Sequence, residues 1–470
     1  MAERNYDLVV IGSGPAGEKG AAQAAYFGKS VALVEREPIL GGAAANTGTL
    51  PSKTLRETAL MLSGFRAREV YGVDLSLRRE ATVKDFVYRE RTVKALERER
   101  IARNIDRHGV DLYHGAGAFA DAHTIEVCGP DGPPARLRGE KILIATGSAP
   151  RRPELFAFED RRIWDSDQVL NLDFMPHSMA VVGAGVIGSE YACTFAALGA
   201  EVSLVDGRAN LLDFLDREIS GRLRETMERK LGIRIVAPAR VTACDPSGKT
   251  VKLALDGGEV LDVEAVLVAA GRQSNTAGLK LENAGIQPGP RGLIHVNACF
   301  QTQIPHIYAA GDVIGFPALA STSMEQARLA MVHAFDLKYK TVFTPILPFG
   351  IFTIPEVSMA GQTEQALEER GIPVVIGRAS YGQNPRGVIV GDFDGLLKLI
   401  FHRESMKLLG VHVVGESATE VVHVGMLALL ADATYEIFIR ACFNYPTLGD
   451  LYKYATYDAM GKRDRGAGSA

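Results

Sequence analysis

The sequence predicts an α/β fold with two similar halves of alternating strands and helices, followed by a third, α+β domain. The two halves are predicted by glycine-rich turns at residues 12–17 and 183–188, each of which follows an apolar strand and opens a helical run. Alternating strands after the proline cluster at Pro345 and Pro348 predict the third domain. At 470 residues the chain exceeds what one hydrophobic core usually holds, so about three domains are expected.

Composition and charge exclude several classes of function. The chain is 47% hydrophobic and 23% charged, as ordinary globular proteins are, and its net charge of -4 offers no basic field for nucleic acid or an anionic membrane. No apolar run is long enough to span a bilayer, and a strand at 6–11 leaves no room for a secretory signal. The five cysteines are scattered, which argues against a metal site and favours a reducing cytoplasm.

The first glycine-rich turn predicts a Rossmann-like dinucleotide-binding fold. An apolar strand at 8–11 precedes it, a helical run at 18–26 follows it, and the next strand, 30–34, ends at Glu35. The glycines permit a tight turn and let the backbone approach a pyrophosphate closely. An acidic residue about 20 positions further on accepts hydrogen bonds from the ribose hydroxyls. A lone turn would be weak evidence, but its surroundings strengthen it. The residues expected at this cofactor are Gly12, Gly14, Pro15, Ala16, Gly17, Glu35 and Arg36.

The second turn has the same surroundings. A strand at 179–182 precedes it, a helical run at 189–198 follows, and the strand at 201–205 ends at Asp206. Two complete fingerprints imply two bound dinucleotides and electron transfer between them. The residues expected at the second dinucleotide are Gly183, Gly185, Val186, Ile187, Gly188, Asp206 and Arg208.

Asp206 and Arg208 bear on the choice between NAD and NADP. An aspartate here binds a free 2′-hydroxyl and repels a 2′-phosphate, whereas an arginine nearby binds that phosphate. The mixed pair favours tolerance of both cofactors. The alternative, that Arg208 is only a solvated surface charge, stays open at this point.

The loop at 41–53 closely resembles the redox loop of the flavin disulfide reductases, the family of glutathione reductase and dihydrolipoamide dehydrogenase. In that family two cysteines stand where this chain has Ala44 and Thr49. The family's C-terminal histidine and glutamate, which serve thiol chemistry, are Tyr445 and Asp450 here. The resemblance therefore implies the electron-transfer scaffold without its disulfide or its thiol base. We interpret Tyr445 as an aromatic side chain that packs over the flavin and has no catalytic role.

Other segments extend this resemblance and imply FAD as one cofactor. The segments 142–147, 266–272 and 307–312 match the family's strand-and-turn motifs, and Asp312 takes the position that holds the ribityl hydroxyls. Lys53 and Glu190 occupy the positions of an ion pair at the flavin N5 edge, and are the candidate catalytic residues. The further residues implied at the cofactors are Gly42, Thr49, Lys53, Thr146, Gly147, Glu190, Gly271, Arg272, Gly311 and Asp312.

The family's domain order implies an interleaved chain. Residues 1–150 and 273–345 are expected to form the FAD-binding domain, residues 151–272 the NAD(P)-binding domain, and residues 346–470 an interface domain. Because residues 346–470 resemble the family's dimer-interface domain, the resemblance also implies a homodimer or higher homo-oligomer. A charged helix is expected at 83–107, and the glycine-rich tail at 461–470 is expected to be disordered.

Four runs narrow the resemblance to the soluble, energy-independent pyridine nucleotide transhydrogenases: 48–57, 313–320, 351–358 and 443–446. That branch implies reversible hydride transfer, NADPH + NAD = NADP + NADH, through FAD. Many of its members keep the first cysteine, which Ala44 replaces here. Two alternatives stay open: an NAD(P)H-dependent quinone or dye reductase, and a non-catalytic binding subunit, which a colourless purified protein would favour.

Overall fold

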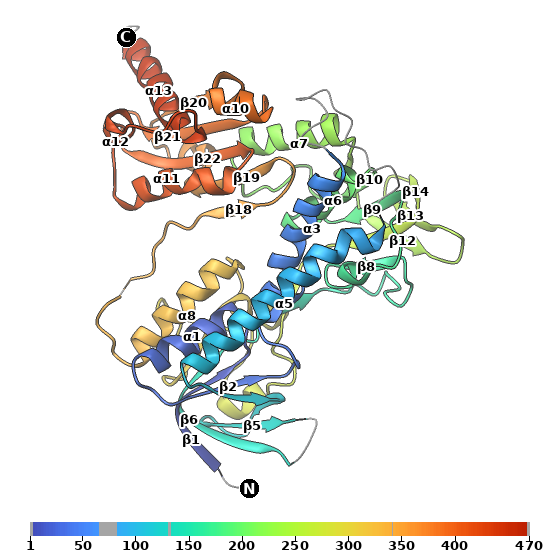
Figure 1. Ribbon diagram of the computed structural model, residues 1–470, viewed down its shortest axis with the longest axis vertical. Helices are drawn as coiled ribbons and strands as arrows, with labels where there is room; N and C mark the ends of the chain where they lie inside the picture. Colours follow the sequence, from blue (N-terminus) through green and yellow to red (C-terminus); the bar gives the residue numbers. More distant parts are fainter. Residues whose placement is uncertain (1–2, 65–81, 130–132, 341, 468–470) are drawn as a thin grey trace. The chain divides into compact units, whose positions relative to one another are not determined.

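The computed structural model describes residues 3–64, 82–129, 133–340 and 342–467 (Figure 1). The chain divides into two compact units. The first unit comprises Met1–Thr54, Val87–Arg151 and Gly271–Thr344, and the second comprises Leu55–Phe86, Arg152–Ala270 and Pro345–Ala470.

A largely parallel sheet forms the centre of the first unit. Its strand order is β3-β2-β1-β6-β5-β4, and β17 pairs with β6 in parallel. The strands are β1 (Glu3–Ile11), β2 (Val31–Glu35), β3 (Asp111–His114), β4 (Ala116–Phe119), β5 (Thr124–Cys128), β6 (Ala135–Ile144) and β17 (Ile307–Ala309). Because β1, β2 and β6 run parallel, their carboxyl ends meet at one edge, where the first glycine turn lies.

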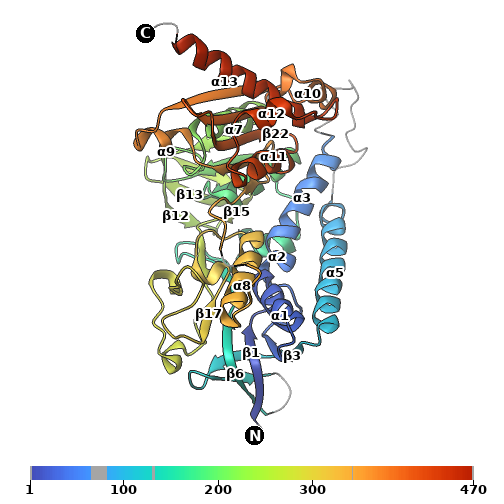
Figure 2. The same cartoon turned by 90° about the vertical axis from the view of Figure 1, so that its left-hand side faces the viewer.

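Two helices from distant parts of the sequence cover this sheet together. Helices α1 (Pro15–Tyr26) and α8 (Ala320–Ala334) lie side by side in both ribbon views (Figures 1 and 2). Alanines of α1 and α8 pack with Leu8, Leu33 and Leu143 in one buried cluster. The other elements are α2 (Gly42–Asn46), the start of α3 (Thr49–Leu62), most of α5 (Val83–Arg107), the paired strands β7 (Ser148–Pro150) and β16 (Arg272–Ser274), and 3₁₀ turns at Leu281–Ala284, Pro290–Gly292 and Asp312–Ile314.

The second unit contains a parallel sheet of order β11-β10-β9-β15-β8. Helix α6 (Val186–Ala197) follows β9 and packs on β9 and β10. The strands are β8 (Ile163–Asp165), β9 (Ser178–Val182), β10 (Glu201–Val205), β11 (Arg234–Val236) and β15 (Ala265–Val268), with α7 (Arg217–Leu231), a 3₁₀ turn at Gln168–Asn171 and an antiparallel meander of β12 (Val241–Asp245), β13 (Val251–Leu255) and β14 (Val260–Val263).

An antiparallel sheet of order β18-β19-β22-β21-β20 completes the second unit. Helix α11 (Ala418–Leu430) packs on β19 and β22, and α13 (Leu451–Ala467) packs on β20 and β21. The other elements are β18 (Phe349–Ile351), β19 (Glu356–Gly361), α9 (Glu364–Glu369), β20 (Val374–Ser380), α10 (Pro385–Val390), β21 (Leu396–His402), β22 (Leu408–Gly415) and α12 (Glu436–Arg440), with 3₁₀ turns at Tyr381–Gln383 and Leu448–Asp450.

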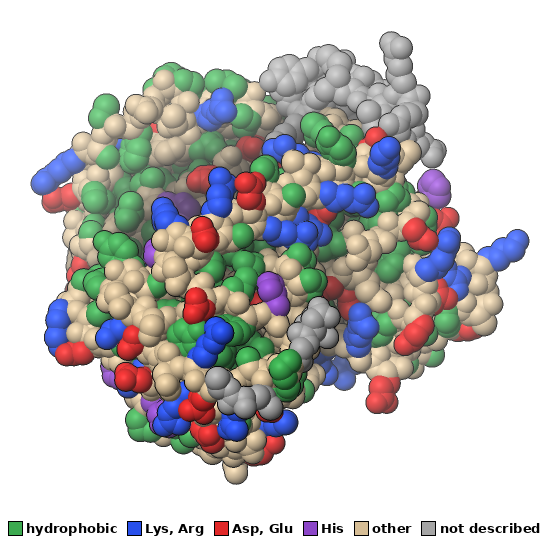
Figure 3. Space-filling model, turned by 60° about the horizontal axis from the view of Figure 1, so that its bottom comes forward, with side chains coloured by type: hydrophobic (Ala, Val, Ile, Leu, Met, Phe, Trp, Pro, Cys, Tyr) green, Lys and Arg blue, Asp and Glu red, His purple; other side chains and the backbone are tan. Residues whose placement is uncertain are grey.

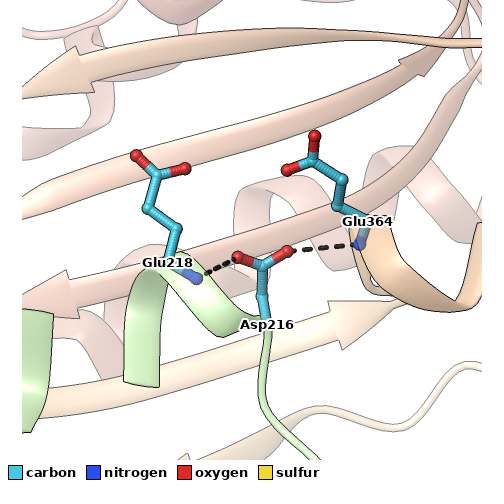
Figure 4. Close-up of side chains that lie close together, drawn as sticks. All are labelled: Asp216, Glu218 and Glu364. Atoms are coloured by element: carbon cyan, nitrogen blue, oxygen red, sulfur yellow. Dashed lines mark hydrogen bonds between the residues drawn. The ribbon is translucent and has the colours of Figure 1, made fainter. Parts of the chain in front are cut away.

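A buried ion cluster joins the amino ends of helices α7 and α9 to strand β21 in the second unit. Lys398 on β21 is 1% exposed, and its Nζ lies 2.8 Å from Asp216 Oδ1, 3.1 Å from Glu218 Oε2 and 2.5 Å from Glu364 Oε2. The backbone N–H groups of Glu218 and Glu364 also donate to the two oxygens of Asp216 (Figure 4). The three carboxylates thus surround an ammonium group, which takes the place that a metal ion would occupy.

The predicted fold class is confirmed: two Rossmann-like βαβ arrangements on parallel sheets are followed by an α+β part with an antiparallel sheet. The three domain boundaries remain a prediction. The expected disorder of the tail is wrong for residues 461–467, which continue α13. Lys462 Nζ bonds Asp458 and Ile376 O, and Arg465 Nε donates to Gly461 O, so local and sheet contacts hold the last turns.

Charged side chains of both signs are interspersed on the face shown in Figure 3. This agrees with the small net charge and with the absence of a basic field in the sequence. Within the described residues, no helix combines the length and apolar character needed to cross a membrane.

Candidate active site

The first glycine turn has the geometry that the fingerprint requires. Gly12 has φ +102°, and a Cβ on Gly17 would lie 1.7 Å from Gly12 O, so neither position accepts a side chain. Gly14 is the N-cap of α1 and makes no side-chain cap, and Pro15 is at the start of the helix. The first turn of α1 therefore presents backbone N–H groups and partial positive charge to an anion.

Glu35 binds this turn directly. Its Oε2 accepts hydrogen bonds from Ser13 N at 2.8 Å and Ser13 Oγ at 2.6 Å, and the Ser13 hydroxyl accepts from Gly41 N at 3.0 Å. A Cβ on Gly42 would lie 2.9 Å from Gly14 Cα, so the loop that begins α2 packs directly on the fingerprint. Arg36 points elsewhere and pairs with Glu37 at the surface.

The carboxyl end of the same sheet adds polar groups from three segments. Asp312 Oδ2 accepts from Ser148 Oγ at 2.6 Å, and Arg272 donates to Ser148 Oγ at 2.7 Å and to Ser148 O at 2.6 Å. Gly311 has φ +82°, and its N–H donates to Gln326 Oε1 at 2.8 Å. Asn275 closes the turn after β6, because it donates to Thr146 O and Gly147 O.

These residues fit FAD. Thr146 Oγ1 is buried and, within the described chain, has no hydrogen-bond partner; such a group is costly unless a ligand pairs with it. Asp312 Oδ1 accepts no hydrogen bond from any described residue, which leaves it for a ribityl hydroxyl. The bare Gly14 and Gly42 backbones form a cradle that a side chain would fill.

The second turn repeats the design of the first. Gly183 has φ +107°, a Cβ on Gly188 would lie 1.8 Å from Gly183 O, and Gly185 is the N-cap of α6. Val186 and Ile187 form the first turn of the helix. Asp206 Oδ2 accepts from Ala184 N at 2.7 Å, as Glu35 accepts from Ser13 in the first turn.

Asp206 and Arg208 form a closed pair. Arg208 donates to Asp206 Oδ1 from its backbone N at 2.8 Å and its Nε at 3.0 Å, and to Oδ2 from Nη2 at 3.1 Å. Burial alone would raise the pKa of Asp206, but the hydrogen bonds from Arg208 and from Ala184 N outweigh burial and lower this pKa. Arg208 is thus hydrogen-bonded to Asp206, and its side chain is 54% exposed, so its role at the cofactor remains a prediction.

Glu190 is buried on α6 at 5% exposure. Its Oε1 accepts from Phe352 N at 2.9 Å, and Arg56 Nε donates to Thr353 O at 3.0 Å. The segment before β19 is therefore held by α6 and by the second half of α3. Lys53 lies on α3 in the first unit and Glu190 in the second, so their predicted ion pair remains a prediction.

The described part of this site contains neither a disulfide nor a reactive thiol. Ala44 lies in α2 and Thr49 begins α3, and all five cysteines are free. Cys193, three residues after Glu190, is fully buried, and burial raises the pKa of its thiol to about 12. It is a protonated thiol at neutral pH and a poor nucleophile. Tyr445 is 75% exposed, and Asp450 lies in the 3₁₀ turn after it.

Three site residues were missed in the sequence. Ser13 holds Glu35 to the loop at Gly41, Ser148 joins Asp312 to Arg272, and Phe352 N binds Glu190. Ser13 stands inside the fingerprint, so a serine between two glycines was a usable signal. The roles of Ser148 and Phe352 depend on partners 124 and 162 residues away, and no local pattern marks them.

Comparison with protein families gives two matches. The family model described as pyridine nucleotide-disulphide oxidoreductase matches residues 6–331, and that described as the dimerisation domain of the same family matches residues 347–456. A soluble pyridine nucleotide transhydrogenase from Mycobacterium tuberculosis is 46% identical over 98% of both chains. One from Chromohalobacter salexigens is 38% identical over 98% of this chain and 100% of its own.

Solved structures with the same fold cover nearly the whole chain. LpdA from Mycobacterium tuberculosis has a TM-score of 0.88 at 25% identity, over 97% of this chain and 99% of its own. The HOCl-induced flavoprotein disulfide reductase RclA from Escherichia coli, as its Cu(II) complex, has a TM-score of 0.86 at 27% identity, over 96% of this chain and 99% of its own.

Proposed function

The chain belongs to the pyridine nucleotide-disulphide oxidoreductase family, and from this premise we propose that it transfers hydride reversibly between NADPH and NAD through FAD. The main observation in support of this proposal is that the redox loop contains no cysteine. Ala44 and Thr49 stand where the family has its two redox cysteines, and Cys193, three residues after Glu190, is buried and protonated. Reducing equivalents then leave by the route through which they entered, as a second nicotinamide cofactor.

In this proposal the first unit holds FAD and the second unit binds one nicotinamide dinucleotide at a time. When bound, FAD supplies the chemistry of accepting a hydride from one nicotinamide and returning it to another. The α1 N-terminus, Thr146 and Asp312 hold FAD; the α6 N-terminus and the pair of Asp206 and Arg208 hold the nicotinamide cofactor. Lys53 and Glu190 keep the reacting edge polar and orient the nicotinamide.

The domain boundaries belong to the same proposal. We place the FAD-binding domain at 1–150 and 273–345, the NAD(P)-binding domain at 151–272 and the interface domain at 346–470. Breaks between compact units at Arg151, Ala270 and Thr344 support these limits. The dimerisation model over 347–456 supports a homo-oligomer.

A cytoplasmic location completes the proposal. The five free cysteines suit a reducing compartment, and the relatives carry the word soluble in their names.

An anaerobic double-mixing experiment tests the function. The purified holoenzyme is first reduced with one equivalent of NADPH and then mixed with NAD, while the flavin absorption is followed. The expected result is loss of the oxidised flavin band on the first mixing and its full recovery on the second, with one equivalent of NADH formed. A flavin that stays reduced after addition of NAD would disprove the proposal.

The quinone or dye reductase alternative is not favoured, because relatives similar over the full length carry the transhydrogenase name. The same double mixing, with a quinone in place of NAD, measures it. If the reduced flavin is reoxidised much faster by the quinone than by NAD, quinone reduction becomes the favoured function in place of transhydrogenation.

A further inference from the structure

The second dinucleotide site must accept cofactors with and without a 2′-phosphate if the proposed function holds. Among the described residues, Asp206 already receives four hydrogen bonds, one from Ala184 N and three from Arg208. A carboxylate has about four lone-pair positions, so the Asp206 carboxylate is saturated in this state. The Arg208 guanidinium uses Nε and Nη2 on Asp206, which leaves Nη1 for another anion.

This pair has no net charge to offer a phosphate. Asp206 cancels Arg208, and Asp213 adds a further negative charge within range of Arg208. A 2′-phosphate, which carries close to two negative charges, therefore needs a second cation at the end of β10.

Arg240 is placed to be that cation. A methyl group on Gly207, between Asp206 and Arg208, would lie 3.1 Å from Arg240 Nε and 3.3 Å from its Cγ, so the Arg240 side chain crosses over the bare backbone of Gly207. The segment is held in place because Ala239 N donates to Asp206 O at 2.8 Å. In the described part of the chain, the Arg240 guanidinium makes no hydrogen bond or ion pair.

Other nearby arginines are already occupied. Arg224 donates to Ala209 O and pairs with Glu228 at 3.2 Å, and Arg234 pairs with Glu259 at 2.6 Å. Arg240 is thus an exposed, unpaired arginine whose side chain lies over Gly207, beside the two residues predicted to bind the adenosine ribose.

We propose that Arg240 binds the 2′-phosphate of NADP(H) and is the residue that lets this site take NADP(H) as well as NAD(H). The inference rests on the proposed function and adds to it a residue outside the fingerprint. Arg208 then serves both cofactors. With NADP(H) it bridges Asp206 and the 2′-phosphate, and with NAD(H) it releases Asp206, which accepts hydrogen bonds from the ribose hydroxyls.

Calorimetric binding of adenosine 2′,5′-bisphosphate and of 5′-AMP to the FAD-loaded enzyme tests the assignment. In Arg240→Gln the affinity for the bisphosphate should fall roughly tenfold while that for AMP stays unchanged, and Arg240→Lys should restore part of the loss. The matched control is Arg161→Gln, because Arg161 is an exposed arginine before β8, at the opposite edge of the same sheet. Flavin absorption and the melting temperature verify that each variant is folded.

Two results would overturn the assignment: unchanged bisphosphate affinity in Arg240→Gln, or an equal loss for bisphosphate and AMP. Binding is measured without turnover, so these results are separable from a failure of the proposed function. If the wild-type enzyme binds the bisphosphate through Arg240 but does not pass hydride from NADPH to NAD, the function fails and the binding role stands.

Discussion

Ser13 and Glu35 show how one buried carboxylate can organise a cofactor loop. Glu35 Oε2 takes two hydrogen bonds from Ser13, and the Ser13 hydroxyl continues the chain to Gly41 N. Asp206 binds Ala184 N in the second site in the same way. In both halves the acid predicted to bind the ribose also fixes the turn predicted to bind the pyrophosphate, which would couple the two parts of dinucleotide recognition.

Replacing Ser13 by alanine should loosen the first site. The change leaves Gly41 N without an acceptor and removes one donor from Glu35, at a cost of about 1–3 kcal/mol. We expect a lower melting temperature and weaker FAD retention on dialysis. Ser247→Ala, at an exposed turn, is the control and should change neither. Unaltered FAD retention in Ser13→Ala would show that the hydroxyl does not position the loop.

Cys193→Ala tests whether a thiol takes part in turnover. Because burial keeps Cys193 protonated, we expect transhydrogenation within about twofold of wild type. The measured quantity is the rate of hydride transfer from NADPH to NAD, compared between variant and wild type at equal flavin content. Loss of turnover beyond tenfold, with the flavin retained, would assign the thiol a chemical role.

At the scale of elements, the Lys398 cluster joins the amino ends of α7 and α9 to strand β21. Lys398→Met would leave Asp216, which is fully buried, without its cation, and should lower the free energy of unfolding by about 3–5 kcal/mol. Lys407→Met is the control, because the exposed pair of Lys407 and Asp432 contributes ~1 kcal/mol or less. Urea unfolding curves measure both variants, and equal losses would contradict the cluster's role.

The same cluster predicts a loss of stability in acid. Burial alone would raise the pKa of Asp216, but the charge of His412 and the hydrogen bond and charge of Lys398 lower it overall. A carboxylate with a depressed folded pKa stabilises the protein above its unfolded pKa, about 3.9, and this contribution is lost as pH falls through the folded value. Asp216→Asn should flatten the decline of unfolding free energy below about pH 4. An unchanged slope would exclude Asp216 as its source.

The sequence predicted the features that are determined by residues close together along the chain. The turns at Gly12 and Gly183, the strands before them and the acids Glu35 and Asp206 follow from local spacing and strand burial. Ser148 and Phe352 could not be predicted because their partners are far away in sequence: Arg272 is 124 residues from Ser148, and Glu190 is 162 residues from Phe352. The tail was misjudged because its glycines and charges suggest disorder, while Lys462 is anchored on β20 through Ile376 O.

At the scale of the whole molecule, the missing sulfur outlet changes what the scaffold can do. A disulfide reductase needs one site for the nicotinamide cofactor and another for a sulfur substrate. Here Ala44, Thr49 and Tyr445 remove the second, so one nicotinamide site must serve donor and acceptor in turn. That demand falls on the end of β10, where Asp206, Arg208 and Arg240 have the proposed role of accepting cofactors with and without a 2′-phosphate.

The assembly should depend on an apolar face of the α+β part. Leu427 and Leu430 on α11 are 62% and 47% exposed, and Tyr454 on α13 is 56% exposed, within the segment matched by the dimerisation model. Leu427→Glu places a charge in both copies of a symmetric interface and removes ~2 kcal/mol of apolar burial from each, so the dimer dissociation constant should rise on the order of a thousandfold. Light scattering across a dilution series measures it. Leu96→Glu, at an exposed leucine of α5 outside the matched segment, should leave the dimer intact; dissociation by Leu96→Glu alone would place the interface elsewhere.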